Sequence, residues 1–398
     1  MLAATATRVA MVALAALSFV TACSSRSTAI PVPVPVATTT LLSRLGVDTV
    51  AVEQYTRTPK HLVGTLVTRL PTTRITRYTV DLGPNGAPTK ADVSTRDGTG
   101  ATLAAGLQSL SVRYGHDSAV FIGHRSASDT TRGFAVRGPI LPSIQNSYGL
   151  WELALARMSL LGRDSVVFAV VPLTFDAREA TPQAVRVISR DSVRIISNGG
   201  PLYMRHDGRG DIVAADGTRT GAKIVVTRVD SLDLDTLAKA WAQRDLSGTP
   251  FGPASTRDTV QATVGNARLW IDYGRPALRG RDVWAHGVLG DTLWRTGANE
   301  ATQLRSDVDL VIGGATVPAG TYTLWTAASP NGYRLVVNGK AGNEYDSKRD
   351  LVRVPLRESS VATPVERFTI SVEPQGTGGA LLELTWGTKR LSVPVAPK

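Results

Sequence analysis

The feature that most constrains this fold is the repetition of short runs rich in Val, Thr, Tyr and Ile, each bounded by turn residues. Residues 74–82 alternate apolar and polar side chains, which is typical of a strand with one face toward solvent. Asp-Gly pairs at 207–208 and 216–217 favour tight hairpins. The order predicts an antiparallel meander rather than βαβ units. The expected strands are 49–57, 61–70, 73–82, 89–95, 107–114, 118–124, 133–137, 165–174, 183–189, 192–197, 202–206, 211–215 and 221–229.

Two helices are expected to interrupt these strands, at 147–161 and 231–244. The first has Ser147 as an N-cap and Gly162 at its end, and it is apolar on nearly every face, which predicts burial. In the second, apolar residues recur at helical spacing, so one stripe should pack on the sheet; they are Leu234, Leu237, Ala238 and Trp241.

A long antiparallel sheet around an apolar helix resembles the half-barrel of lipoprotein carriers and outer-membrane lipoprotein receptors. The resemblance is one of architecture, and it implies an apolar cavity for lipid. The alternative, which we favour, is that helix 147–161 fills a closed core, in which case fatty acids would not bind. The expected fold is thus mainly β, with an N-terminal antiparallel β-sheet or half-barrel carrying two helices, followed by a C-terminal β-sandwich.

Cys23 is the only cysteine of the 398 residues, and it directly follows an apolar run from Val9 to Val20. Arg8 precedes that run, as in a secretory signal peptide. The run is shorter than the roughly 20 residues that span a bilayer. Its end, Val-Thr-Ala-Cys, resembles the lipobox of bacterial lipoproteins, which implies cleavage before Cys23 and acylation of its thiol. Ser24 resembles the outer-membrane pattern, so we expect a lipid anchor in that membrane and a chain that faces the periplasm.

Amino-acid composition indicates how the chain is divided into a signal peptide, a stalk and folded domains. Alternating Pro and Val at 31–36 favour extended polyproline II, and we expect residues 23–46 to form a stalk after a signal peptide at 1–22. The remaining 350 or so residues suffice for two domains, 47–255 and 259–398. The net charge of +11 would suit nucleic acid in a cytoplasmic protein, but the expected compartment argues against that partner.

Known catalytic motifs do not occur in the sequence, among them Gly-x-Ser-x-Gly, His-Glu-x-x-His and a phosphate-binding Gly-Lys-Thr loop. His116, Asp117 and His124 could meet across a hairpin, but such spacing is common by chance, and we expect no metal and no cofactor. We favour a non-enzymatic protein that binds a ligand or partner. The alternatives are a hydrolase of envelope glycan or lipid and a purely structural envelope protein.

Residues 261–395 carry a series of distinctive motifs. They are Ile-Asp-Tyr-Gly-Arg-Pro at 271–276, Gly-Arg-Asp-Val-Trp at 280–284, Leu-Trp-Arg-Thr-Gly-Ala-Asn-Glu-Ala-Thr at 293–302, Val-Pro-Ala-Gly-Thr-Tyr-Thr-Leu-Trp at 317–325, Glu-Arg-Phe-Thr-Ile at 366–370 and Leu-Ser-Val-Pro-Val at 391–395. This third of the chain resembles the family catalogued as domain of unknown function 2911, which implies no established activity. Short strands at 307–311, 320–326, 333–337, 352–356, 367–372, 380–386 and 389–393 suggest a sandwich or jelly roll.

The run from Trp294 to Thr302 is polar and not periodic, and it supplies the candidate binding residues. Arg295, Asn299 and Glu300 offer donors and acceptors, while Trp294 offers an apolar wall, so together they suit a small polar ligand such as a sugar or carboxylate. Gly297 is expected to allow a turn forbidden to other residues. The alternative is a structural loop in which Arg295 pairs with Glu300 or backbone carbonyls. Arg275 and His286 are weaker candidates for the same patch.

Overall fold

The computed structural model describes residues 37–103, 107–125, 127–197, 199–285, 293–376 and 378–398. The expected signal peptide, Cys23, most of the expected stalk and His286 lie outside these ranges. The chain from Thr38 onward belongs to one compact unit. None of the helices in the described ranges is long and apolar enough to cross a membrane.

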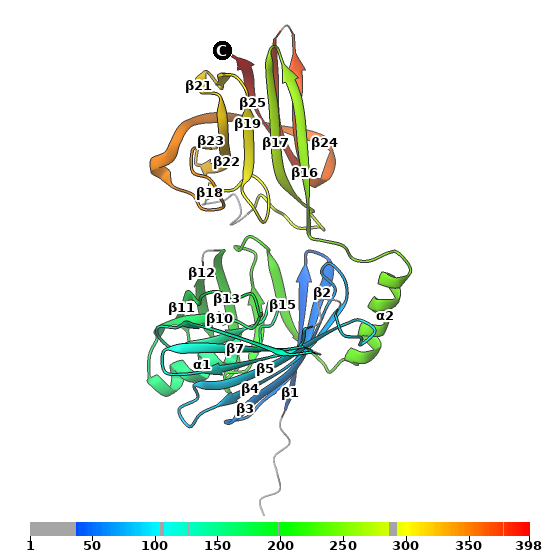
Figure 1. The fold of residues 1–398 in the computed structure, drawn as a ribbon, viewed down its shortest axis with the longest axis vertical. Helices are drawn as coiled ribbons and strands as arrows, with labels where there is room; N and C mark the ends of the chain where they lie inside the picture. The colour runs from blue at the N-terminus through cyan, green and yellow to red at the C-terminus, as the bar shows by residue number, and fades with distance from the viewer. Residues whose placement is uncertain (1–36, 104–106, 126, 198, 286–292, 377) are drawn as a thin grey trace, which may run out of the picture. The chain divides into compact units, whose positions relative to one another are not determined.

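Fifteen strands of the described chain form the first sheet, in the order β8-β7-β6-β5-β4-β3-β2-β1-β15-β14-β13-β12-β11-β10-β9. Neighbours pair antiparallel except β9 and β10, which are parallel, so the predicted antiparallel N-terminal sheet is confirmed. Figure 1 shows the sheet curving around an interior. Its strands are β1 (Thr38–Leu45), β2 (Asp48–Arg57), β3 (His61–Thr68), β4 (Arg74–Leu82), β5 (Pro88–Asp97), β6 (Leu107–Tyr114), β7 (Ser118–Arg125), β8 (Asp129–Ala135), β9 (Ile140–Ser143), β10 (Ser165–Pro172), β11 (Thr181–Ser189), β12 (Ser192–Ser197), β13 (Gly200–His206), β14 (Ile212–Asp216) and β15 (Ile224–Val229).

The predicted boundary between the stalk and the first domain differs from the structure at strand β1. The expected stalk at 23–46 is wrong over residues 38–45, which pair with β2 on one side and β15 on the other. Leu41 and Leu45 lie buried in the core of the first sheet. The Pro-rich stretch masked the start of the strand, although Thr39, Leu41 and Leu45 share one face of it, as in a half-buried pleat.

Helix α1 (Trp151–Leu161) begins later than predicted. Ser147 does not cap it; the Ser147 hydroxyl instead donates a hydrogen bond to the Glu53 carboxylate, 2.5 Å away. The predicted end is confirmed, because Gly162 takes a left-handed conformation with φ 59° at the C-cap.

The apolar character of α1 does not bury the whole helix. Leu153 and Met158 pack inside the first sheet, but Leu160 and Leu161 are 66% and 42% exposed. The expectation of burial on every face is therefore wrong for the last turn, where the helix leaves the interior of the sheet.

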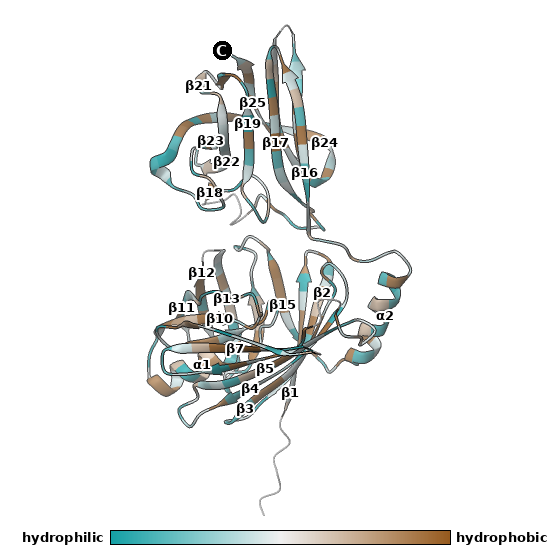
Figure 2. Ribbon diagram, in the orientation of Figure 1, coloured by the Kyte–Doolittle hydropathy of each residue, from teal (hydrophilic) through white to brown (hydrophobic). Residues whose placement is uncertain are grey.

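Helix α2 (Leu234–Leu246) packs on the outer face of the sheet, as its apolar spacing predicted. Asp233 caps it by accepting a hydrogen bond from the Thr236 amide at 3.0 Å. Figure 2 shows hydrophilic and hydrophobic residues alternating along this helix. The cluster beneath it contains Val52, Val67, Ile75, Leu234, Ala238 and Trp241.

The second sheet has ten described strands in the order β16-β17-β19-β22-β23-β24-β25-β20-β21, with β18 paired to β22. Four of the predicted short strands are instead halves of the two long strands β24 and β25, whose pairing shifts register between residues 360 and 369. A 3-10 turn at Ser347–Arg349 precedes β24. The strands are β16 (Ser255–Val264), β17 (Ala267–Pro276), β18 (Leu293–Trp294), β19 (Thr302–Ser306), β20 (Leu310–Ile312), β21 (Ala315–Val317), β22 (Gly320–Ser329), β23 (Gly332–Asn338), β24 (Asp350–Gln375) and β25 (Gly379–Pro397).

The second sheet folds back over itself to enclose an aromatic core. The Tyr273 hydroxyl of β17 accepts a hydrogen bond from the Ile370 amide of β24 at 3.1 Å, which ties the two layers together. The Trp294 ring lies 4.9 Å from Phe368 and 5.9 Å from Trp386, measured between centroids. This arrangement confirms the predicted C-terminal β-sandwich.

Candidate functional site

The loop after β18 is held by its own backbone. The Trp294 indole N–H donates to the Gly297 carbonyl at 2.7 Å, and the Thr302 hydroxyl donates to the Thr296 carbonyl at 2.6 Å. The Arg295 guanidinium donates to the Asn299 carbonyl. Trp294 is buried rather than available as an open wall, so its ring serves the core of the second sheet.

We expected Gly297 to allow the turn in this loop, but the turn does not depend on the conformational freedom of that residue. The left-handed residues are Thr296 and Asn299, with φ of 51° and 67°. The small residue matters at Gly274 instead, where an added Cβ would lie 2.1 Å from the Ala298 carbonyl oxygen. The loop backbone thus rests directly on β17.

The other predicted site residues do not join Arg295. Arg275 donates to Asp258 at 2.7 Å, to the Phe368 carbonyl at 3.2 Å and to the Thr369 hydroxyl at 3.1 Å, which makes it a tie between layers. Glu300 pairs with Arg257 at 3.2 Å rather than with Arg295. His286 lies outside the described residues.

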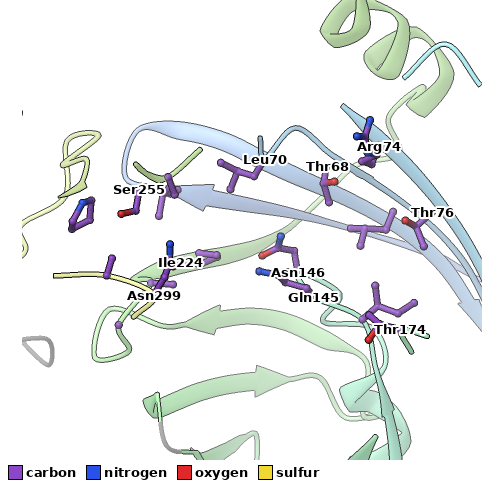
Figure 3. A pocket seen from close by; sticks show the side chains of 18 of the residues that line it. Thr68, Leu70, Arg74, Thr76, Gln145, Asn146, Thr174, Ile224, Ser255 and Asn299 are labelled. Carbon is purple, nitrogen blue, oxygen red and sulfur yellow. The ribbon is translucent and has the colours of Figure 1, made fainter. Parts of the chain in front are cut away.

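A partly open cavity of about 570 Å³ brings part of this loop together with the interior of the first sheet. Its size falls within the range of ligand pockets, roughly 300–1,000 Å³. Trp294, Arg295 and Asn299 line it, whereas Glu300 and Arg275 do not. Figure 3 shows Gln145 and Asn146 near the middle of the view, with Thr68 and Leu70 above them and Ile224 and Asn299 to their left.

The walls of the cavity mix aliphatic and polar side chains that come from strands distant in the sequence. Apolar lining residues on both sides of the interior include Leu45, Leu66, Leu70, Val93, Ile144, Leu173 and Ile224. Hydroxyl groups interrupt this surface. The Thr76 and Thr95 hydroxyls bond to each other at 3.1 Å, and Thr68 and Thr174 stand nearby on the lining.

The charged groups on the cavity are all cationic. Arg74, Arg281 and Arg295 line it, and no Asp or Glu is among the described lining residues. Arg281 donates to the Leu278 carbonyl at 2.9 Å, to the Ala222 carbonyl at 2.8 Å and to the Ala277 carbonyl. Burial, together with the nearby charge of Arg279, lowers the pKa of Arg281 to about 10. The cavity therefore offers positive charge beside apolar surface.

Next to the cavity, the interior holds two buried carboxylates that the sequence analysis did not single out. Glu53 accepts hydrogen bonds from the hydroxyls of Tyr78 and Ser147, both at 2.5 Å, and from the amides of Tyr148 and Gly149 at 2.7 and 2.9 Å. Burial raises the pKa of Glu53 above its usual value, and these hydrogen bonds oppose that rise.

The second carboxylate, Glu152 of α1, accepts from the Tyr55 hydroxyl at 2.5 Å, from Arg57 Nε at 2.8 Å and from the Ile212 amide at 2.7 Å. Arg57 also reaches Asp211 at 2.9 Å. Burial raises the pKa of Glu152 as well. We call Glu53, Glu152 and their hydrogen-bond partners the carboxylate network; it joins α1 to the sheet and does not line the cavity.

Two of the arginines that line the cavity lie in segments that were noted in the sequence for other reasons. Arg281 lies within the Gly-Arg-Asp-Val-Trp motif at 280–284, and Arg74 opens the alternating run at 74–82. Neither segment indicated that the two residues share a cavity with Arg295. Among the described residues, no group of three or more His, Cys, Asp or Glu side chains could hold a metal ion.

No curated protein matches this chain. A solved DUF1089 family protein from Pseudomonas aeruginosa is 12% identical with a TM-score of 0.32, over 42% of this chain and 90% of that one. The binding domain of botulinum neurotoxin DC, in complex with rat synaptotagmin II, is 9% identical with a TM-score of 0.17, over 90% of this chain and 84% of that one. At these TM-scores neither likeness bears on fold or function. Residues 255–395, which comprise the second sheet, match the family described as Protein of unknown function (DUF2911).

Proposed function

We propose that this protein is a lipid-anchored binding protein of the bacterial envelope, and that it takes up an amphipathic ligand in the cavity beside the loop after β18. The observation that carries the proposal is the composition of that cavity, in which aliphatic walls meet hydroxyl, amide and guanidinium groups. Apolar walls combined with polar groups that can orient a ligand are typical of small-molecule sites.

This proposal favours the carrier-like alternative over the closed core that we preferred from the sequence. Leu153 and Met158 of α1 do belong to the core, as expected. The cavity lies elsewhere, on the inner faces of β1, β3, β4, β5 and β15, and no residue of α1 lines it. A filled core around α1 is therefore compatible with an apolar binding site in the same sheet.

The other two function classes have less support. The hydrolase hypothesis required Arg295, Glu300 and His286 to converge, but Glu300 is directed to Arg257 and does not line the cavity. A purely structural envelope protein would have no use for a cavity of this size and composition. Ligand binding is the hypothesis that accounts for the residues that line the cavity.

The first experiment measures binding of a fluorescent fatty acid to the chain from Ser24 to Lys398, which retains every described residue. We expect saturable binding that unlabelled fatty acid displaces. In Thr68→Trp, a large ring on the cavity lining should weaken binding by about tenfold, because it occupies the space of the ligand. Thr79→Trp is the matched control, since Thr79 stands opposite the exposed Val63 on the outer face of the sheet. Equal affinity in the two variants would place the ligand outside the cavity.

The second experiment tests the anchor, because Cys23 lies outside the described residues. Cys23→Ala should leave an unprocessed precursor or a soluble species without acyl modification. Partition into a detergent phase, compared with the unchanged chain, measures the effect. Normal maturation of Cys23→Ala with unchanged partition would contradict a lipid anchor at this position.

A further inference from the structure

We infer that the ligand of the cavity is an anionic amphiphile whose head group binds where Arg281, Arg295 and Asn299 meet the apolar wall. This inference rests on the proposed function and specifies the chemical class of the ligand. It follows from the partners of the cavity cations, from the absence of acidic residues on the described lining, and from the position of the aliphatic surface.

Arg295 has unused hydrogen-bonding capacity. A guanidinium has five N–H donors in a planar fork, and within the described residues the Arg295 side chain donates one hydrogen bond, to the Asn299 carbonyl. Glu300, five residues after it in the sequence, is paired with Arg257 instead. Among the described residues no carboxylate forms an ion pair with Arg295. An anionic oxygen in the cavity would complete this fork.

Arg281 is positioned as a second cation at the same site. Three of its nitrogens bond to backbone carbonyls, which orient the guanidinium and neutralise none of its charge. Glu366 lies near enough to favour the charged form, but it forms no ion pair with Arg281 in the described chain. Partly buried positive charge without a carboxylate partner is unfavourable alone, and an anion in the cavity would offset that cost.

The rest of the cavity supplies a place for an apolar chain. Leu45, Leu66 and Ile224 belong to the lining, and Figure 3 shows Ile224 near Asn299, with Thr68 and Thr76 farther from that loop. Arg74, the third cation, lies among threonine side chains at another part of the lining, and its recorded hydrogen bond goes to the Thr73 carbonyl. Arg74 lies opposite Asp97 on the neighbouring strand, and its charge helps to lower the pKa of Asp97. Arg74 is therefore less available than Arg281 and Arg295 to bind an anion.

Carboxylate and phosphate head groups share the chemistry that a guanidinium fork recognises. A fatty acid and a phospholipid with one acyl chain removed would therefore both fit the inference. The experiment below separates these sources by comparing the two head groups on the same chain length.

The test uses displacement of the fluorescent fatty acid by four competitors that each carry a 16-carbon chain, on the chain from Ser24 to Lys398. They are hexadecanoate, hexadecyl phosphate, hexadecanol and monopalmitoylglycerol. We expect both anions to bind about tenfold more tightly than the two neutral compounds, because charge-assisted hydrogen bonds are lost with the neutral ones. The tighter of the two anions identifies the preferred head group.

Arg295→Gln should weaken both anions by about tenfold and leave hexadecanol unchanged, since the apolar wall is intact. Arg281→Gln should act in the same direction, and if that variant does not fold, Arg295→Gln carries the test alone. Arg334→Gln is the control for net charge, because Arg334 is exposed on β23 and does not line the cavity.

Equal affinity for anionic and neutral competitors would overturn the inference while leaving the proposed function in place. An Arg295→Gln variant that weakens hexadecanol and hexadecanoate alike would also overturn it, because the arginine would then act through the shape of the cavity. If none of the four compounds displaces the probe, and the probe itself does not bind, the proposed function fails and the inference fails with it.

Discussion

In the carboxylate network of the first sheet, Glu53 accepts four hydrogen bonds on its two oxygens. At the neighbouring cavity, the guanidiniums of Arg281 and Arg295 donate only to backbone carbonyls among the described residues. Strand β4 joins the two regions, because alternate residues face the same side. Tyr78 reaches Glu53, and Thr76 and Arg74, two and four residues earlier, line the cavity.

The difference shows how one sheet separates stability from binding. Buried charge that serves the fold is fully hydrogen-bonded, since an unpaired buried polar group costs about 1–3 kcal/mol. The cavity cations keep spare donors and adjoin empty space. Changes in the carboxylate network should therefore affect unfolding most, and changes at the cavity should affect ligands most.

The largest effect is expected for Glu53→Leu, which leaves two buried amides and two hydroxyls without their acceptor. We expect a loss of about 5 kcal/mol in the free energy of unfolding, measured with urea. Glu53→Gln is the matched control and should cost about 1 kcal/mol. Its carbonyl oxygen can face the two amides, while its NH₂ group faces hydroxyls that can rotate to accept. Equal losses in both variants would mean that volume, not hydrogen bonding, holds α1.

The next prediction compares two leucines of the same interior. Leu153→Ala in α1 should cost about 3 kcal/mol in the free energy of unfolding, within the usual range for a closed core. Leu70→Ala should cost less, because Leu70 lines the cavity and is only partly buried. The difference in urea midpoint checks this. A larger loss for Leu70→Ala would mean that the cavity is closed in solution.

Local pattern was enough to predict most of the first sheet, but not the central strand β1, the edge strand β9 or the interior. The alternation at 74–82 and the Asp-Gly turns are short-range signals, and strands formed where they indicated. Strand β1 was missed because the preceding Pro residues suggested an extended stalk. Halves of β24 and β25 were separated because the register shift near residue 365 resembles a turn in the sequence.

The candidate site was predicted only in part, for a physical reason. Arg295 and Asn299 were recognised because a polar, aperiodic run stands out among alternating strands. Arg281 and Arg74 were not, because a cavity is assembled from long-range strand pairing that no local pattern encodes. Arg275 had the residue type of a ligand-binding group, but its bonds to Asp258 on the neighbouring strand and to Phe368 in the other layer use it in the fold.

The second sheet can also be compared with the first. Its hydrophobic core consists only of residues between Val260 and Val395. A chain starting near Thr256 should therefore fold by itself, with β-type circular dichroism and a cooperative melt close to that of the same sheet in the full chain. Far-ultraviolet spectra and thermal scans measure this. Failure to fold, with rescue on adding residues 46–255, would show that the two sheets share one cooperative unit.

The smallest effect concerns pH and follows from the raised pKa of Glu53. An acid whose pKa is higher in the folded state binds more protons there, so its contribution to stability is complete below the unfolded value near 4.5 and is lost as pH rises through the folded pKa. Glu53→Gln cannot ionise and lacks this loss. Its stability relative to the unchanged chain should therefore improve as pH rises from 4 to 8. Glu152, whose pKa is also raised, is present in both chains and cancels in the difference. Urea midpoints at each pH measure it. A difference that stays constant across that range would mean that burial does not penalise the Glu53 carboxylate, and the network would then stabilise the charge as fully as water does.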